Sequence, residues 1–243
     1  MTYEAPGYRD AAAAFAGRMA AAWGEMLGAR LLGVYLIGSL AHGGFSARYS
    51  DIDVGVTTED GVRPDELEAM RARAAADSRE LAAKLSIFWS DRSFAMGRFP
   101  PLDRVDYVDH AVPLVERERI RPPRPTRDEI RTYLRGQPFE AWTEQVRRFS
   151  AASALQPAEH KPYVRCLLYP ARLLYSFATG AMASNDEAAA FLAWRRIPGL
   201  DFGLVERALK CRQAGRDPDF LFPERAMLGR QHAACTAAIG VTA

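Results

Sequence analysis

The sequence predicts an α+β fold in two domains, a mixed β-sheet with helices followed by an all-helical bundle. Before residue 120, short apolar runs rich in branched and aromatic residues alternate with helical patterns, whereas nearly every segment after residue 126 has helical periodicity. Residues 121–125 contain three prolines, which fit neither a helix interior nor a central strand. We therefore expect domains over residues 1–120 and 126–243, joined by this linker.

The first domain is expected to begin with a helix and then to supply the strands of the sheet. Apolar residues recur every four positions over residues 8–27, which predicts an amphipathic helix. Pro64, followed by two acids, predicts the start of a second helix that ends near residue 84. Short apolar or alternating runs predict strands at residues 31–37, 51–56, 85–89 and 111–115.

The second domain is expected to consist of helices. Thr126 and Glu129 have the spacing of a capping box, and Gly136 is a typical helix end. Periodic apolar residues predict further helices at residues 138–154, 162–179, 184–195, 201–214 and 223–239.

The charge balance argues against a protein that coats a polyanion. The 243 residues include 32 basic and 30 acidic side chains, for a net charge of +2. No run of Lys or Arg with interleaved aromatics marks a groove for a nucleic-acid strand, and no window approaches the ~20 apolar residues of a membrane span. We therefore expect neither a nucleic-acid nor a membrane partner.

Cysteine usage and the N-terminal composition favour a cytoplasmic protein. The three cysteines are widely spaced and odd in number, which fits neither a disulfide framework nor a Cys-x-x-Cys metal site. Charged residues interrupt the apolar stretch near the N-terminus, unlike the core of a secretory signal. We therefore expect the protein in a reducing compartment, the cytoplasm.

The candidate catalytic and binding residues lie between residues 38 and 53, from the end of the first predicted strand to the start of the second. Gly38 permits a tight turn after a strand, so that Ser39 can approach a phosphate. Asp51 and Asp53 stand two residues apart on a strand and point the same way, as a pair of oxygen ligands for Mg²⁺ would. A Gly-Ser pair or an Asp-x-Asp strand is common by itself, but in this order they are the parts that phosphoryl and nucleotidyl transfer require.

Two stretches of this segment resemble a known superfamily. Gly-Ser-Leu-Ala-His-Gly-Gly at 38–44 and Ser-Asp-Ile-Asp at 50–53 are similar to the motif of polymerase β-type nucleotidyltransferases. They look most like the aminoglycoside adenylyltransferases that act on streptomycin and spectinomycin, and residues 163–212 resemble the helical domain of that family. The resemblance implies a polymerase β-like domain that transfers AMP from ATP to a hydroxyl of a small polar acceptor, such as an aminoglycoside. It also implies Mg²⁺ ligation by Asp51 and Asp53, and nucleotide contacts from Ser39 and Ser50. Gly38 and Asn185 are further candidates for nucleotide binding.

Two positions depart from the family pattern. Ser86 stands where the family has a general-base Glu on its third strand, and a serine cannot accept a proton at neutral pH. Asn185 stands where the family has a Lys that would meet phosphate. Either the base has moved, or the metal activates the hydroxyl unaided, or transfer is reduced or lost, because general-base help is worth ~10² to 10⁴-fold.

Other acids are candidates to replace the missing base. Asp91 is the first choice because it shares a predicted strand with Ser86, although it lies five residues further on and so alternates to the opposite face. The other candidates are Asp103 and Asp106 in the next connection, and Glu140 and Glu144 on a helix of the second domain. Each of them is also explained by a solvated surface position.

The acceptor is expected between the domains, where small ligands usually bind. A cationic acceptor would require acids, which Glu140, Glu144 and Asp186 offer, although Asp186 also lies inside a capping-box pattern that begins at Ser184. Two alternatives remain open: AMP transfer to a protein hydroxyl, as in nucleotidyltransferases of toxin and antitoxin type, and a nucleotide-binding protein with reduced or lost transfer activity.

Overall fold

The chain folds into two compact units, Met1–Arg124 and Pro125–Ala243. We analysed a computed structural model, which describes residues 7–241. The boundary falls within the proline-rich segment 121–125, where a helix or central strand cannot continue. Within the described range, every helix is too short or too polar to cross a lipid bilayer.

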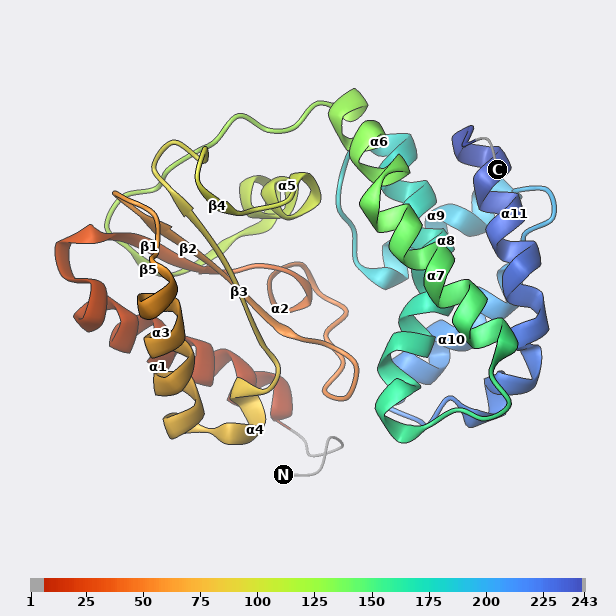
Figure 1. The fold of residues 1–243 in the computed structure, drawn as a ribbon, viewed down its shortest axis with the longest axis horizontal. Helices are drawn as coiled ribbons and strands as arrows, with labels where there is room; N and C mark the ends of the chain where they lie inside the picture. Colours follow the sequence, from red (N-terminus) through yellow and green to blue (C-terminus); the bar gives the residue numbers. More distant parts are fainter. Residues whose placement is uncertain (1–6, 242–243) are drawn as a thin grey trace. The chain divides into compact units, whose positions relative to one another are not determined.

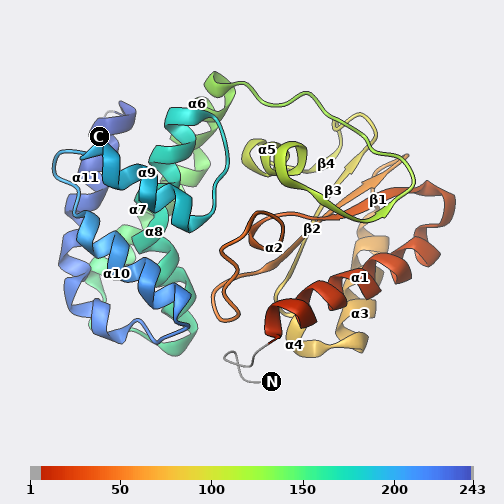
Figure 2. The same cartoon turned by 180° about the vertical axis from the view of Figure 1, so that it is seen from behind.

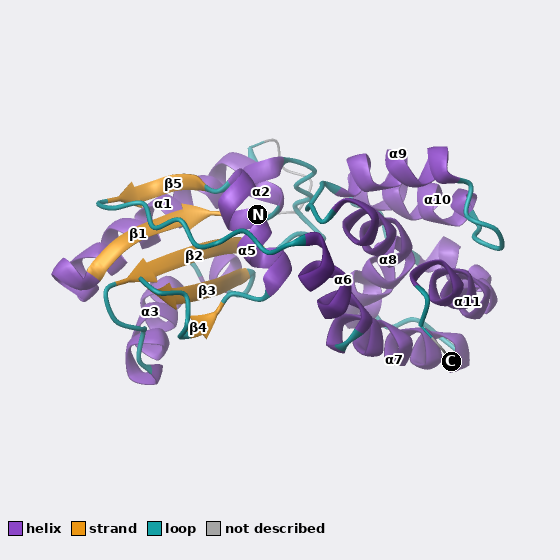
Figure 3. Cartoon of the chain, turned by 90° about the horizontal axis from the view of Figure 1, so that it is seen from above, coloured by secondary structure: helices purple, strands orange, loops and turns teal. Residues whose placement is uncertain are grey.

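A five-stranded mixed sheet forms the centre of the first unit, in the order β4-β3-β2-β1-β5 (Figure 3). β2 and β3 run parallel, and the other neighbours are antiparallel. The mixed sheet confirms the predicted α+β class. The strands are β1 (Leu31–Leu36), β2 (Ile52–Thr58), β3 (Leu85–Asp91), β4 (Gly97–Arg98) and β5 (Val112–Glu116).

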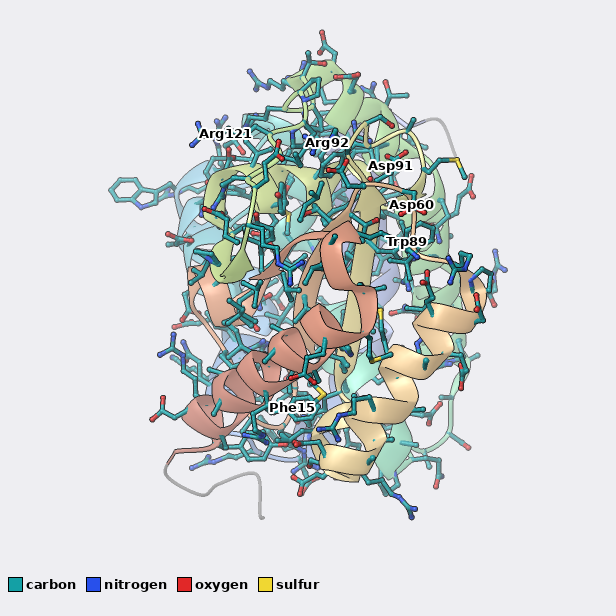
Figure 4. The ribbon with its side chains drawn as sticks, turned by 90° about the vertical axis from the view of Figure 1, so that its left-hand side faces the viewer. Phe15, Asp60, Trp89, Asp91, Arg92 and Arg121 are labelled. Atoms are coloured by element: carbon teal, nitrogen blue, oxygen red, sulfur yellow. The ribbon has the colours of Figure 1, made fainter. Side chains whose placement is uncertain are left out.

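The two faces of this sheet are covered by different helices (Figures 1 and 2). α1 (Tyr8–Leu27) and α3 (Pro64–Asp77) pack on one face around a large apolar core, in which Phe15 of α1 is fully buried (Figure 4). α5 (Pro101–His110) covers the other face around a smaller aromatic core. The remaining helical segments are short: Gly28–Arg30, α2 (Ser39–His42) and α4 (Arg79–Ala82).

Two predictions in the first unit require correction. The helix expected over residues 64–84 is broken at Ser78, whose backbone is extended and whose hydroxyl accepts the N–H of Leu81 to cap α4. The connection that contains Asp103 and Asp106 is the helix α5, which the sequence reading missed. Its start has the same sequence signal as α3, a proline at the first position with an acid in the first turn.

The second unit is helical, as predicted. The capping box at its start is confirmed, because the Thr126 hydroxyl accepts from the Glu129 amide at 3.2 Å while the Glu129 carboxylate accepts from the Thr126 amide at 2.7 Å. The last predicted helix begins late, since its first part is the 3₁₀ segment Asp219–Met227. The α-helices are α6 (Arg127–Arg135), α7 (Gln137–Ala151), α8 (His160–Thr179), α9 (Asn185–Arg195), α10 (Phe202–Gln213) and α11 (Leu228–Ile239).

Candidate functional site

Strand β2 sends alternate residues to the two faces of the sheet. Val54 and its neighbours of the same parity are buried in the core beneath α1 and α3. Gly55 faces α5, because a side chain there would meet Phe99 and Tyr107. Asp53 has the parity of Gly55, so its carboxylate lies on the α5 face, as the sequence pattern predicted.

The glycine turn and the Asp53 carboxylate meet in the structure. Gly38 has a φ of +65° and begins α2, immediately after β1. A Cβ at Gly38 would lie 2.5 Å from Oδ2 of Asp53, so a larger residue would displace this carboxylate, and the positive φ also favours glycine. The Ile37 amide also donates to the Asp53 carbonyl at 3.1 Å. The two halves of the motif, which are separated by 11 residues in the chain, therefore form one site.

Ser39 and Ser50 are joined to each other across the loop between β1 and β2. The Ser39 hydroxyl donates to the Ser50 Oγ at 2.9 Å, and the Ser46 amide donates to the same oxygen at 3.0 Å. Ser50 is buried, and its carbonyl precedes Asp51. Both serines thus lie in the hydrogen-bonded loop that carries the carboxylates, and their predicted contact with a nucleotide remains a prediction.

Lys84 supports the same loop, and sequence reasoning missed it. Its ammonium, on a side chain that is almost fully buried, donates to the carbonyls of Ala47, Arg48 and Ser50 at 2.5, 3.4 and 3.4 Å. A compact ammonium with three donors suits three converging carbonyls better than a planar guanidinium does. Only three of the 32 basic residues are lysines. A lysine directly before a predicted strand is therefore unusual in this sequence, and this was the one signal that could have pointed to Lys84.

The structure does not bring Asp91 to the site, which corrects the first choice for a replacement base. Asp53 pairs with Ser86 in the parallel register of β2 and β3, whereas Asp91 pairs with Thr58 at the other end. Alternation also turns Asp91 to the face of α1 and α3. Figure 4 shows it in the region of Arg92, and its carboxylate accepts from the nearby Ser93 hydroxyl at 2.9 Å.

Asp106 is the predicted acid that reaches the glycine turn. It extends from α5, and its Oδ2 accepts the Gly38 N–H at 2.5 Å. Its Oδ1 lies 3.6 Å from Nε2 of His42, at the other end of α2. The residue is 2% exposed. Asp103, a further candidate, lies one turn earlier on α5. Asp53 and Asp106 therefore approach the same glycine from different elements.

The acids predicted in the second unit have local partners or open surroundings. Glu140 and Glu144 lie one turn apart on the exposed face of α7, and Glu144 pairs with Arg147 at 2.6 Å. Asp186 accepts a hydrogen bond from the side-chain amide of Gln213. The capping box that begins at Ser184 is confirmed, and it makes Asn185 the first residue of α9. Their roles toward an acceptor or nucleotide remain predictions.

The residues around Gly38 fit Mg²⁺. Asp51 and Asp53 are half-buried carboxylates two residues apart at the start of β2, and hard oxygens are the ligands that Mg²⁺ prefers. Gly38 lacks the side chain that would displace the Asp53 carboxylate. When bound there, Mg²⁺ would neutralise charge on a polyphosphate and keep several water ligands.

A second group of possible metal ligands lies in the second unit. His160 Nδ1 is 2.9 Å from an oxygen of Asp217, and its Nε2 is 3.5 Å from an oxygen of Asp219. Each imidazole nitrogen of His160 faces a different carboxylate. A metal ion would bind to only one of the two nitrogens. The group therefore fits a histidine that ties the segment 217–219 to the start of α8.

Comparison with known proteins supports the fold. No protein-family model matches the sequence. No curated protein matches it either. The structure is similar to that of spectinomycin adenyltransferase AAD(9) from Enterococcus faecialis with ATP and spectinomycin, with a TM-score of 0.60. The match covers 92% of this chain and 98% of that chain, with 10% identical residues. It confirms the aminoglycoside adenylyltransferase-like fold that the motif resemblance implied.

Proposed function

We propose that the chain is a Mg²⁺-dependent nucleotidyltransferase that transfers AMP from ATP to a hydroxyl of a small polar acceptor. The observation that carries the proposal is the contact of the Asp53 carboxylate with the Gly38 turn, next to Asp51 and Ser39. The fold similarity to an adenyltransferase with ATP and spectinomycin supports ATP as co-substrate and a small molecule as acceptor.

Each residue of the site has a definite task in this reaction. Asp51 and Asp53 would hold Mg²⁺, and the Ser39 hydroxyl would bind a phosphate oxygen at the start of α2. The acceptor oxygen forms a bond to the α-phosphorus of ATP while the bond to pyrophosphate breaks, and the hydroxyl proton leaves to water. Gly38 allows the turn to lie close to Asp53, so that a phosphate bound at the turn would stay at a fixed distance from the carboxylates.

The proposed acceptor class requires negative charge at its site. An aminoglycoside is cationic, so its site should contain acids. We assign Glu140, Glu144 and Asp186 as candidate acceptor contacts and Asn185 as a candidate nucleotide contact, all from the second unit. The open surroundings of Glu140 and Glu144 on α7 are consistent with binding a polar ligand.

A second candidate function is nucleotide binding with slow or absent transfer. The observation that favours it is the register of β2 and β3, which pairs Ser86 with Asp53. A hydroxyl thus lies on the site face where the family's glutamate would stand, and the loss of a general base slows transfer by ~10² to 10⁴-fold without preventing nucleotide binding.

Pyrophosphate release separates these functions. The protein is incubated with ATP, Mg²⁺ and a panel of acceptors that includes spectinomycin and streptomycin. We expect it to release pyrophosphate, and we expect Asp51→Ala to abolish this release. Asp65→Ala is the matched control, because this acid is 75% exposed at the start of α3. Full activity of Asp51→Ala would refute the mechanism. ATP binding without release would favour the second function, and AMP adducts found only on proteins of a treated lysate would favour a protein acceptor.

A further inference from the structure

The glycine turn at residues 38–43, called the phosphate turn below because the proposed function places a phosphate there, depends on its neighbours for its shape. α2 has four residues and lies between two glycines with positive φ, +65° at Gly38 and +98° at Gly43. Its own hydrogen bonds are those of Ala41 and His42 to the Gly38 carbonyl, both at 3.0 Å. Isolated helices shorter than ~12 residues are marginal in water, so a single turn requires external contacts.

One carboxylate reaches both ends of this turn. Asp106 accepts the Gly38 amide at the start of α2 and lies 3.6 Å from the His42 imidazole at its end. Its side chain is 4% exposed, so water competes little for these contacts.

α5 holds Asp106 in a fixed position. The residues on both sides, Val105 and Tyr107, are 0% and 1% exposed. The Tyr107 hydroxyl donates to the Ile120 carbonyl at 2.9 Å, and burial raises the pKa of this phenol, which keeps the donor proton in place. The Tyr107 ring meets Tyr35 edge to face at 5.1 Å, on the strand that leads directly to Gly38.

We propose that Asp106 is a positioning residue that preforms the phosphate turn before a nucleotide arrives. This proposal rests on the proposed function for its effect on ATP. Because the Asp53 carboxylate contacts Gly38, a shift of the turn changes the distance between the phosphate contacts and the metal ligands. A displacement of about 1 Å is enough to cost ~10²-fold in rate. The two carboxylate oxygens face Gly38 and His42, which favours positioning over proton transfer.

Hydrogen exchange tests the positioning without any ligand. The probes are the Gly38 amide, which donates to Asp106, and the amides of Ala41 and His42, which donate to the Gly38 carbonyl within the turn. We expect Asp106→Ala to raise their exchange rates roughly tenfold or more while the amides of β1 stay protected, because the hydrogen bond that anchors the start of the turn is lost. Asp106→Asn keeps an acceptor oxygen, so its exchange rates should lie between those of the wild type and those of Asp106→Ala. Unchanged exchange in both variants would overturn the proposal.

The matched control lies on the same helix. Asp109→Asn removes an acid three residues along α5, whose partner is Arg124 at 2.7 Å. Surface ion pairs contribute little, so the turn should exchange as in the wild type. If Asp106→Ala does not fold, the Asn variant carries the test. Equally faster exchange throughout β1 and the turn would show a general loss of stability and would also overturn the proposal.

ATP binding supplies the functional test. For folded protein, we expect Asp106→Ala to raise the dissociation constant for Mg-ATP about tenfold, with a smaller change in Asp106→Asn and none in Asp109→Asn. The affinity for Mg²⁺ alone should stay unchanged. A loss of Mg²⁺ affinity as large as in Asp51→Ala would make Asp106 a ligand and overturn the positioning role. A wild-type protein that binds no Mg-ATP would refute the proposed function, while the exchange experiment would still decide this one.

Discussion

The two faces of the sheet in the first unit differ in what they contribute, although the same strands build both. The face beneath α1 and α3 is continuous and apolar, and Val54, Ile87 and Trp89 extend its core. The face beneath α5 combines a small aromatic core with polar residues, among them Asp53 and Ser86. Residues one position apart on a strand thus belong to different parts of the molecule, the apolar core on one face and the proposed site on the other.

This contrast explains where polar groups are tolerated. An apolar core stabilises a fold through area removed from water, about 25 cal/mol per Å². Carboxylates near one another oppose folding unless a cation or hydrogen bonds stabilise them. On the α5 face, the Asp106 carboxylate accepts a hydrogen bond from the Gly38 amide, and Asp53 lies where Mg²⁺ fits. The site face therefore accepts a cost in stability that the other face offsets.

Adjacent substitutions on β2 give the largest expected contrast. We expect Asp53→Asn to lower the rate of AMP transfer by about a thousandfold or more, because a metal ligand is lost, and to leave the free energy of unfolding unchanged or slightly higher, because a carboxylate without a bound cation opposes folding. Val54→Ala should do the opposite. It removes two methyl groups from a fully buried position, costs about 2 kcal/mol of unfolding free energy, and leaves the activity of the folded protein unchanged.

Pyrophosphate release and urea unfolding measure both variants of this pair. The contrast fails if Val54→Ala lowers the activity of folded protein as strongly as Asp53→Asn does. It also fails if Asp53→Asn unfolds at a much lower urea concentration than the wild type, because the carboxylate would then be part of the fold.

The sequence predicted the residues of one strand better than the meeting of distant elements. Period-two alternation placed Asp53 on an open face, and the structure shows this face toward α5. The contact of Asp106 with Gly38 joins residues 68 positions apart, and no local pattern contains it. A buried acid inside α5 also interrupts the apolar stripe by which helices are recognised, which is why that helix was missed.

The choice of Asp91 failed for a related reason. Membership of the same strand as Ser86 suggested proximity, but a strand advances about 3.3 Å per residue and alternates faces. The parity of the two residues already argued against the choice. Lys84 could not be found from pattern alone, because its three carbonyl partners belong to a loop without regular structure.

Restoring an acid at position 86 tests what the site face lacks. Ser86 pairs with Asp53 in the register, so Ser86→Glu places a carboxylate on the same face. If transfer is limited by the missing base, we expect the rate to rise roughly ten- to a hundredfold, the lower part of what a positioned base supplies. Ser86→Gln has the same size without the charge and should stay at or below the wild-type rate.

The outcome of this variant is read from the rate of transfer under saturating ATP, with the urea midpoint as a check on folding. An equal rate for Ser86→Glu and Ser86→Gln would show that a base at this position is not what limits the reaction. Transfer that appears only in Ser86→Glu would identify the natural protein as one that binds a nucleotide and has lost transfer.

The smallest expected effect lies on the folding side of the comparison, in an ion-pair group beside α3. Arg30 donates to Glu66 at 2.6 Å and to Asp60 at 2.6 Å. The hydrogen bond from Arg30 to Glu66 is the main cause that lowers the pKa of Glu66 from 4.5 to about 2, and a backbone hydrogen bond from Arg63 adds to it. A carboxyl with a lower pKa in the folded state stabilises the fold above about pH 4.5 and loses this contribution as the pH falls toward 2. Because Arg30 is partly exposed, we expect Glu66→Gln to cost about 1 kcal/mol or less at pH 7. Urea unfolding should show this difference shrink between pH 4.5 and 2, while the Kd for Mg-ATP at pH 7 stays constant. A constant difference at every pH would mean that the side chain stabilises the start of α3 by packing and not by its charge.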